Sequence, residues 1–239
     1  MGQLDGKTAI VTGASSGIGE AIAAAFAAEG AKVALAARRA DRLEALAVRI
    51  GHGAIAVRAD VTKEPDVLAL FERTKAAFGR VDILVNNAGI ARHKPTDETT
   101  LAEWQEVIDI NLTAAFLCAR EALKAMKPQK SGRIINIGSV SARRPRLHTI
   151  GYAASKFGLE GMTHSIAMEG REHGITCSIL HPGVTESNLA GDTTTKASDK
   201  IMPVVEVAKI VTLMAALPRD MSFLDATVLP IGMPFLARA

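Results

Sequence analysis

The chain has 239 residues and a formal net charge of +3, with no long run of Lys or Arg, so its charge gives no support for nucleic-acid binding. No stretch approaches the roughly 20 apolar residues of a membrane-spanning helix, so we expect no membrane partner. Hydrophobic residues make up 48% and charged residues 22% of the chain, which is typical of a globular protein.

The two cysteines, Cys118 and Cys177, lie far apart in the sequence, and we interpret them as reduced core residues. The amino-terminal residues also lack the apolar stretch of a signal peptide, so we expect a cytoplasmic protein. The length fits a single domain over residues 1–239, because no linker or internal repeat divides the chain. The six histidines have no metal-ligand spacing, and we predict no catalytic metal.

Short apolar runs alternate with longer helical patterns along the chain. We predict strands at residues 8–11, 32–36, 54–58, 83–85, 133–137, 176–180 and 226–229. We predict helices at residues 17–29, 41–49, 65–78, 101–127, 153–172 and 204–216, and Gly30, Gly79 and Gly174 follow three of them where a left-handed C-cap is common. The strands are continuously apolar, as strands covered on both faces are, so the order predicts an α/β fold with a parallel sheet between helices. The longest irregular stretch, about 183–203, is predicted to be a substrate loop.

A glycine-rich turn, Thr12-Gly13-Ala14-Ser15-Ser16-Gly17-Ile18-Gly19, follows the first strand. Glycines allow positive φ and a close approach to a ligand, and the start of a helix offers unpaired N–H groups to a pyrophosphate. The dinucleotide-binding candidates are therefore Gly13, Ser15, Ser16, Gly17, Ile18 and Gly19. The motif alone is weak, because its spacing is not Gly-x-Gly-x-x-Gly and a glycine turn can simply join a strand to a helix.

The second strand ends at Ala36-Ala37-Arg38-Arg39, where proteins that bind NAD usually carry an acidic residue for the ribose 2′-hydroxyl. A carboxylate would repel a 2′-phosphate, whereas a guanidinium binds one through paired hydrogen bonds. We therefore favour NADP (NADPH) as the cofactor, with Arg38 and Arg39 at its 2′-phosphate. The alternative is that both arginines are solvated residues at a helix start.

Two further strand ends supply cofactor-binding candidates. Asp60 and Val61 end the third strand, where the carboxylate could accept a hydrogen bond from the adenine amino group or cap the next helix. The fourth strand runs into Asn86-Asn87-Ala88-Gly89. Ala88 and Gly89 would leave room for a ring against the backbone, and an ordinary strand-to-loop turn is the alternative.

Tyr152 and Lys156 are four residues apart, so on a helix they share one face. A phenol has an unperturbed pKa of about 10, and a nearby ammonium would lower that pKa toward the working pH that acid/base catalysis requires. Tyr152 is also the only tyrosine in the chain. Short spacings often match by chance, so on these two residues alone an accidental pair is the alternative.

Ser139 and Asn111 extend this set. Ser139 follows the predicted strand 133–137 at its carboxyl end, where ligands bind in open α/β sheets, and its hydroxyl could bond to a substrate carbonyl. Asn111 lies inside a long predicted helix, where Asn has only modest propensity, which indicates a local role. An exposed Asn of little consequence is the alternative.

In this order and spacing, the motifs resemble those of the short-chain dehydrogenase/reductase family from residue 7 to about residue 203. The resemblance implies a Rossmann fold with a doubly wound, seven-stranded parallel sheet. It implies that Tyr152 is the general acid/base, and that Lys156 lowers its pKa and holds the nicotinamide ribose. Ser139 would steady the substrate carbonyl, and Asn111 would hold a water in a proton relay toward Lys156.

The resemblance also adds cofactor positions. Pro182-Gly183 and Thr185 match the segment that cradles the nicotinamide end, and Asn87 matches the wall on the adenosine side. Members without an acidic residue after the second strand usually prefer NADP, and such enzymes are commonly tetramers, so we expect a homotetramer or homodimer. Residues 227–235 depart from the Asp-Gly-Gly with which many relatives end the last strand, which leaves the substrate end and the subunit contacts open.

The leading hypothesis is an NADP(H)-dependent oxidoreductase that interconverts a small-molecule ketone or aldehyde and the corresponding alcohol. The alternatives are a 3-oxoacyl-thioester reductase of the same family and a dinucleotide-binding regulator without turnover. Two basic segments, Arg92-His93-Lys94 and 143–146, leave the ends of neighbouring strands. They suggest attraction of an anionic or carrier-bound substrate, with solvated or interface charges as an equally good explanation.

Overall fold

The computed structural model describes residues 2–51, 53–186 and 201–233. These residues form one seven-stranded sheet in the order β3-β2-β1-β4-β5-β6-β7, and every neighbouring pair of strands is parallel. The strands are Thr8–Thr12 (β1), Lys32–Ala37 (β2), Ile55–Arg58 (β3), Ile83–Asn86 (β4), Gly132–Ile137 (β5), Ile175–Pro182 (β6) and Asp225–Val228 (β7). The predicted Rossmann fold with a seven-stranded parallel sheet is confirmed.

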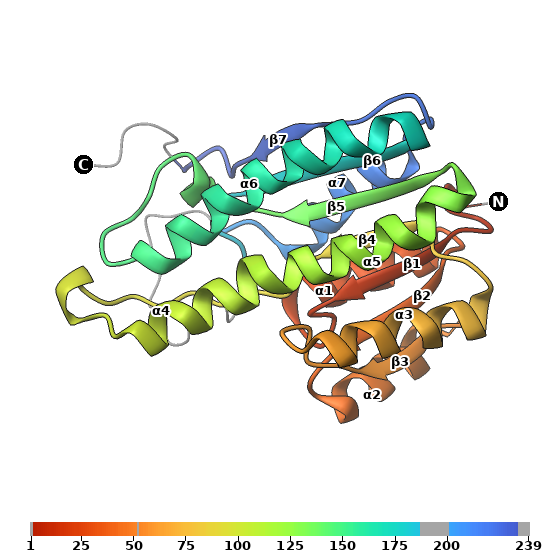
Figure 1. Ribbon diagram of the computed structural model, residues 1–239, viewed down its shortest axis with the longest axis horizontal. Coiled ribbons are helices and arrows are strands. Elements are labelled where there is room, and N and C mark those ends of the chain that lie inside the picture. Colours follow the sequence, from red (N-terminus) through yellow and green to blue (C-terminus); the bar gives the residue numbers. More distant parts are fainter. Residues whose placement is uncertain (1, 52, 187–200, 234–239) are drawn as a thin grey trace.

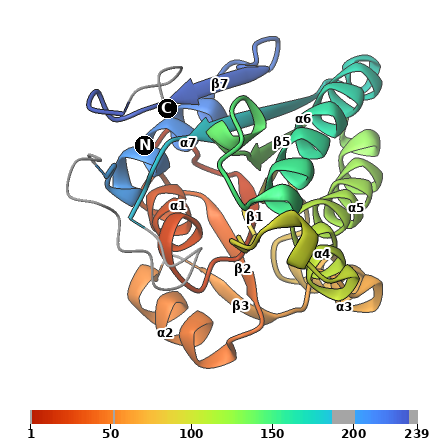
Figure 2. The same cartoon turned by 90° about the vertical axis from the view of Figure 1, so that its left-hand side faces the viewer.

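Helices cover both faces of the sheet, as the strand–helix alternation predicted (Figure 1, Figure 2). One face carries α1, α2 and α7, and the other carries α3, α5 and α6. The helices are Gly17–Ala28 (α1), Ala40–Ile50 (α2), Glu64–Phe78 (α3), Leu101–Ile108 (α4), Ala114–Gln129 (α5), Ile150–Gly170 (α6) and Val204–Ala216 (α7). Among the described residues, no helix is both long and apolar enough to cross a membrane.

The core lies on both sides of the sheet, because successive strand residues point to opposite faces. In β1, Val11 packs in the cluster beneath α1 and α7, whereas its neighbour Ile10 packs in the cluster beneath α3 and α5. All five residues of β1 are buried, which explains why its sequence is continuously apolar rather than alternating. Cys118 and Cys177 are free thiols buried in this core, as predicted.

Three helical segments are followed by a glycine with left-handed backbone, as predicted. Gly30, Gly79 and Gly174 have φ of 88°, 81° and 65°, a region that other residues enter only at a steric cost.

Two predicted helices near the site differ from the structure, one by an interruption and one by an earlier start. The predicted helix 101–127 is interrupted by a π-helical turn, Asp109–Thr113, between α4 and α5. The helix predicted to begin at residue 153 begins at Ile150, so Tyr152 lies inside its first turn. Gly151, a poor helix former, lies in this first turn where α6 packs against α4, and a Cβ there would make ordinary contact with the Val107 side chain at 3.5 Å.

Only the two ends of the predicted substrate loop are described. Thr185 pairs with Met202 in an isolated parallel bridge, supported by hydrogen bonds from Glu186 N to Met202 O (3.0 Å) and from Met202 N to Val184 O (2.9 Å). Residues 187–200 of that loop and residues 234–239 of the carboxyl-terminal segment lie outside the described residues.

Candidate active site

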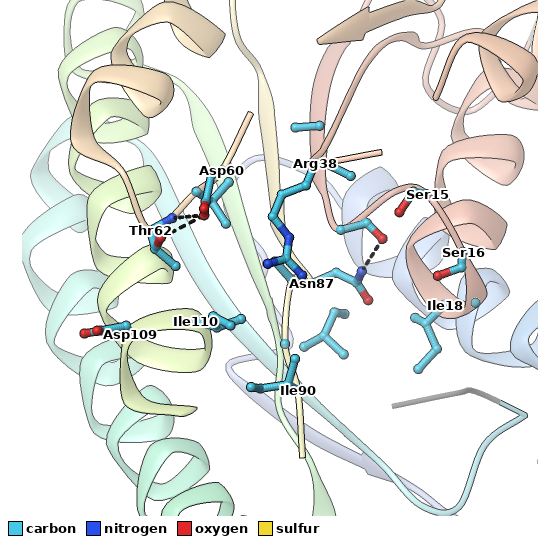
Figure 3. Close-up of a pocket in the computed structure, with 18 of the residues that line it drawn as sticks. Ser15, Ser16, Ile18, Arg38, Asp60, Thr62, Asn87, Ile90, Asp109 and Ile110 are labelled. Carbon is cyan, nitrogen blue, oxygen red and sulfur yellow. Dashed lines mark hydrogen bonds between the residues drawn. The ribbon is translucent and has the colours of Figure 1, made fainter. Parts of the chain in front are cut away.

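A cleft of about 830 Å³ lies at the carboxyl ends of the strands, and most of the predicted site residues meet there (Figure 3). The predicted residues that line it are Gly13, Ser15, Ser16, Gly17, Ile18, Arg38, Arg39, Asp60, Val61, Asn87, Ala88, Gly89, Ser139, Tyr152, Lys156, Pro182, Gly183 and Thr185. Gly19 and Asn111 lie behind its wall. A single cavity therefore joins the glycine-rich turn to the predicted acid/base pair.

The glycine-rich turn is built for close approach. Gly13 and Gly17 have φ of 65° and 60°, as the sequence suggested. A Cβ on Gly13 would lie 2.9 Å from Ala88 Cα, and one on Gly19 would lie 2.4 Å from Asn87 Nδ2. Asn87 braces the turn, because its side-chain amide donates to Gly13 O (3.3 Å) and to the preceding carbonyl of the turn (3.0 Å). Gly19 therefore shapes the site from behind rather than lining it.

The start of α1 opens onto the cleft with its N–H groups uncapped. Ser16 occupies the N-cap, yet its side chain makes no capping hydrogen bond. Arg39 instead donates to the hydroxyls of Ser15 and Ser16, both at 2.9 Å. Unpaired N–H groups, two hydroxyls and a guanidinium together suit a phosphate-bearing ligand.

Asp60 lies across the cleft from this turn, and Arg38 lies between the two (Figure 3). Asp60 Oδ1 accepts hydrogen bonds from the Thr62 N–H (3.1 Å) and hydroxyl (2.8 Å). Burial acts to raise the pKa of Asp60, but these bonds and the charges of Arg38 and Lys63 lower it below its usual value. Lys63, not Asp60, occupies the N-cap of α3. It is also a cleft cation that the sequence analysis missed, and its position two residues after the Asp60-Val61 pair was the available signal.

Ser139, Tyr152 and Lys156 come together at the other end of the cleft, and all three are buried. Ser139 Oγ accepts from Ser141 N at 3.1 Å, which leaves its own hydrogen for the hydrogen bond with the Tyr152 hydroxyl. Lys156 Nζ donates to Ile137 O at 2.8 Å and lies 5.6 Å from the centroid of the Tyr152 ring. The arrangement offers two hydroxyls to one acceptor beside a buried amine.

The expected lowering of the Tyr152 pKa by Lys156 was wrong for this structure. Burial of the ring raises the pKa of Tyr152, and the opposing effects come from the Ser139 hydroxyl and the charge of Arg146. Burial also lowers the pKa of Lys156 to about 8, because a charged amine loses its hydration there. A proton therefore stays on the phenol at neutral pH, while the amine titrates near the physiological range.

Asn111 links two parts of the site without facing the cleft. It lies in the π-helical turn with 1% of its surface exposed. Its Nδ2 donates to Ile90 O (2.9 Å) and Ser155 Oγ (3.0 Å), and its Oδ1 accepts from Ile90 N (2.8 Å). The side chain therefore ties the segment after β4 to α6, next to Lys156.

Three cations of the two basic segments are paired with carboxylates, which weakens the hypothesis of a positively charged entrance. Arg143 forms ion pairs with Glu160 and Asp225, behind β5 and away from the cleft. Arg92 pairs with Glu106, and Lys94 pairs with Glu103 at 3.0 Å. These carboxylates offset the charges of the three cations, whereas the charge of Arg146 still acts on Tyr152.

A small second pocket also has Tyr152 in its lining. Its lining includes Arg92, Lys94, Trp104, His148 and Tyr152. Neither Trp104 nor His148 was among the predicted site residues. His148 is exposed, with a positive φ of 63°.

Comparison with known proteins places this geometry in context. The family model described as short chain dehydrogenase matches residues 7–198. The 3-oxoacyl-(acyl-carrier-protein) reductase of Synechocystis sp. is 42% identical over 193 residues, which cover 79% of this chain and 78% of that protein. The D-threitol dehydrogenase of Mycolicibacterium smegmatis is 40% identical over 190 residues, covering 78% and 73% of the two chains.

Solved structures agree with these sequence relatives. The 3-ketoacyl-(acyl-carrier-protein) reductase of Brucella melitensis, complexed with NADH, matches with a TM-score of 0.88, 32% identity and coverage of 94% of this chain and 97% of that one. The alcohol dehydrogenase of Thermococcus sibiricus, complexed with 5-hydroxy-NADP, matches with a TM-score of 0.88, 28% identity and coverage of 95% and 98%. With the motifs, the fold and these relatives in agreement, the chain belongs to the short-chain dehydrogenase/reductase family of oxidoreductases, which act on CH–OH groups.

Proposed function

We propose that this oxidoreductase uses NADP(H) to interconvert a small-molecule ketone or aldehyde and its alcohol, with Tyr152 as the general acid/base. One observation carries the proposal: a single cleft has the glycine-rich turn with Arg38 and Arg39 at one end, and Ser139, Tyr152 and Lys156 at the other.

The residues present fit a nicotinamide dinucleotide phosphate. Gly13 keeps open a space that a Cβ would fill, the α1 N–H groups are uncapped, and Pro182 and Gly183 line the end beside Tyr152. An acidic residue that could bind a ribose 2′-hydroxyl is absent at Ala37. The two arginines that follow it suit a 2′-phosphate instead. When bound, the cofactor supplies the hydride.

In this mechanism the chain's own residues move one proton. The buried phenol of Tyr152 keeps its proton at neutral pH, which suits donation to a carbonyl oxygen during reduction. The Ser139 hydroxyl, fixed by Ser141 N, is placed to hydrogen-bond the same oxygen. Removing bulk water strengthens both interactions as negative charge develops on that oxygen.

Lys156 and Asn111 would then restore the proton. With a pKa of about 8, the Lys156 amine can hold or release a proton near neutral pH. Both amide hydrogens of Asn111 are used by Ile90 and Ser155, so a relay water would bind to its Oδ1 or to the backbone of the π-helical turn. We propose that Asn111 also positions Lys156 through its bond to Ser155.

A 3-oxoacyl-thioester substrate is the second candidate, because relatives at 42% and 32% identity carry that activity in their names. The ion pairs of Arg92, Lys94 and Arg143 weaken the argument from a basic entrance. Comparing kcat/KM for thioester-linked 3-oxoacyl substrates with that for unlinked ketones and aldehydes separates the two. The regulator without turnover has no support, since the named relatives are oxidoreductases.

The Tyr152→Phe variant tests the mechanism. Loss of the hydroxyl should lower kcat with NADPH by about 10²- to 10⁴-fold, the usual contribution of a general acid, while NADPH affinity measured by fluorescence stays within a few-fold. Glu169→Gln, at an exposed position on the same helix, serves as the control and should keep full turnover. If Tyr152→Phe kept full turnover, the assignment of the acid/base would be wrong.

We further propose that residues 1–239 form one domain that works as a cytoplasmic homotetramer or homodimer. One sheet runs through the described chain, which supports the single domain. Exposed apolar side chains on α5 and α6, Phe116 and Phe157, support an interface between subunits. Analytical ultracentrifugation of the purified protein tests the oligomeric state.

A further inference from the structure

A second group of polar side chains lies where α6 packs against β6, next to the neighbouring strand β7 (Figure 1). Glu160 and His164 are one helical turn apart on α6 and share a face. His181 lies near the end of β6, and Asp225 begins β7. One donor atom from each of Glu160, His164 and Asp225 lies within 4.8 Å of the other two.

Three buried atoms in this group have no hydrogen-bond partner. They are Glu160 Oε2, His164 Nε2 and His181 Nε2. An unpaired buried polar atom costs on the order of 1–3 kcal/mol, so most such atoms in folded proteins have a partner. Glu160 Oε2 lies 3.7 Å from His181 Nε2, and Glu160 and His164 belong to one group of potential ligands, so one common partner would satisfy unpaired atoms on all three residues.

In the tautomer that has its hydrogen on Nδ1, His181 indicates that this partner is a cation. Its side chain is 0% exposed, and its Nδ1 lies 2.9 Å from Ser139 O, the shorter of its two contacts with that backbone. Donation from Nδ1 to this carbonyl leaves a lone pair on Nε2. That lone pair faces Glu160 Oε2 at 3.7 Å and Asp225 Oδ1 at 3.5 Å, so acceptors face acceptors.

The surrounding bonds are those that usually orient metal ligands. A metal-binding imidazole commonly donates its other N–H to a backbone carbonyl, as His181 does to Ser139. Arg143 binds Glu160 Oε1 and Asp225 Oδ2, which holds both carboxylates and leaves their other oxygens toward His181. Two carboxylates and one guanidinium leave a net negative charge, which a divalent ion would reverse.

We propose that Glu160, His164 and Asp225 bind a divalent transition metal, with His181 as the fourth ligand and Zn²⁺ as the best match. Zinc takes imidazole and carboxylate ligands in tetrahedral sites, and bonds of 2.0–2.1 Å place the ligand atoms about 3.4 Å apart. The separations of 3.5 and 3.7 Å from His181 Nε2 are close to that value, and the ligand atoms of Glu160, His164 and Asp225, within 4.8 Å of one another, would move closer together around the ion. With four protein ligands the metal is structural, joining α6, β6 and β7 behind Ser139, and it takes no part in the proton transfer proposed above.

The test uses tag-free purified protein, stripped with a chelator and dialysed. Zn²⁺ is then added, its stoichiometry is measured by mass spectrometry of the metal, and its affinity by competition with a chromophoric chelator. We expect one equivalent with a Kd below 1 μM and a rise in Tm, because a ligand that binds only the folded state stabilises it. Co²⁺ added in place of Zn²⁺ should give the visible absorption of a tetrahedral site.

Two ligand variants and one control make the result specific. His164→Gln and Asp225→Asn should each weaken Zn²⁺ binding by at least tenfold and abolish the Co²⁺ spectrum, while circular dichroism confirms folding. His93→Gln removes an exposed histidine outside the group and should change neither readout. Substoichiometric binding by the parent protein, or unchanged binding by His164→Gln, would overturn the site. Neither result bears on the proposed oxidoreductase mechanism, which turnover of Tyr152→Phe tests separately.

Discussion

Two regions of this molecule are rich in arginine, but only one of them has carboxylates beside its arginines. At the end of β2, Arg38 and Arg39 line the cleft, and Arg39 binds only hydroxyls and a backbone carbonyl. Among the residues that the structure describes, neither arginine forms an ion pair. Beyond β4 and β5, by contrast, Arg92 and Arg143 are paired with carboxylates.

The difference teaches which charges are available to a ligand. Arg38 and Arg39 follow a strand whose end is fixed by the sheet, so their position next to the glycine-rich turn follows from local sequence. The partners of Arg92 and Arg143 lie 14 to 82 residues away, so no local pattern reveals them. A cluster of cations in a sequence is therefore available to bind a ligand only if the fold places no carboxylates next to it.

The largest expected effect is at Gly13, where the cofactor end depends on the backbone. In Gly13→Ala the new Cβ would collide with the Ala88 backbone at 2.9 Å, at a φ of +65°. We expect the Kd for NADPH, measured by fluorescence titration, to rise by at least about 10²-fold. Gly79→Ala is the matched control, since it has φ of +81° with no atom within 4 Å of the new Cβ. Both changes should cost about 1–3 kcal/mol of backbone strain, but only Gly13→Ala should lose NADPH.

Removing the two free arginines should change cofactor choice rather than turnover. A hydrogen bond to a charged group contributes about 1.5–3 kcal/mol, so Arg38→Ala combined with Arg39→Ala should raise the KM for NADPH by roughly 10- to 100-fold. The KM for NADH should change little. Arg42→Ala, an exposed arginine on the next turn of α2, controls for lost positive charge. An equal rise in KM for both cofactors would contradict a role at the 2′-phosphate.

These two tests concern features that could be predicted from the sequence. Strand ends of a parallel sheet meet at one edge, so the order of Gly13, Asn87, Ser139 and Tyr152 along the chain was enough to place them in one cleft. What the sequence could not supply depends on packing. The π-helical turn at Asn111 and the early start of α6 reflect how helices fit together, and they override local propensity.

The electrostatics of the site were harder still to predict. The spacing of Tyr152 and Lys156 indicated that they are neighbours, but the amine bonds to Ile137 O, and burial shifts both pKa values. Burial is a property of the whole fold, and here it raises the pKa of the phenol, against the expected effect of the ammonium. The metal ligands were missed for a related reason, since Glu160 and His164 gain their partners only when β6 and β7 come together.

Burial of Lys156 should also be measurable as pH-dependent stability. Because its pKa falls from 10.5 to about 8 on folding, the unfolded chain binds more protons in that window, and stability should rise as pH increases. From pH 7 to pH 9.5 this contributes about 2 kcal/mol, which Lys156→Met should lack. The buried thiols of Cys118 and Cys177, whose pKa rises from 9.0 to about 12, act in the opposite direction above pH 9.

The measurement is therefore a difference. Urea unfolding of the parent protein and of Lys156→Met at each pH cancels the thiols, which both proteins share. The difference in free energy of unfolding should grow by about 2 kcal/mol across the window, and a constant difference would contradict a buried, titrating amine.

The smallest expected effect concerns Arg92, whose guanidinium is paired with Glu106. If Glu106 neutralises Arg92, then Arg92→Ala should leave the ratio of KM values for an anionic and a neutral carbonyl substrate unchanged. Glu106→Gln should instead expose the guanidinium, and because exposed ion pairs contribute about 0.2–1 kcal/mol, the KM for the anionic substrate should fall by only about twofold to fivefold. The fall should disappear when Glu106→Gln is combined with Arg92→Ala. If Arg92→Ala alone weakened binding of the anionic substrate, the charge would already be available to ligands, and the contrast between the two basic regions would fail.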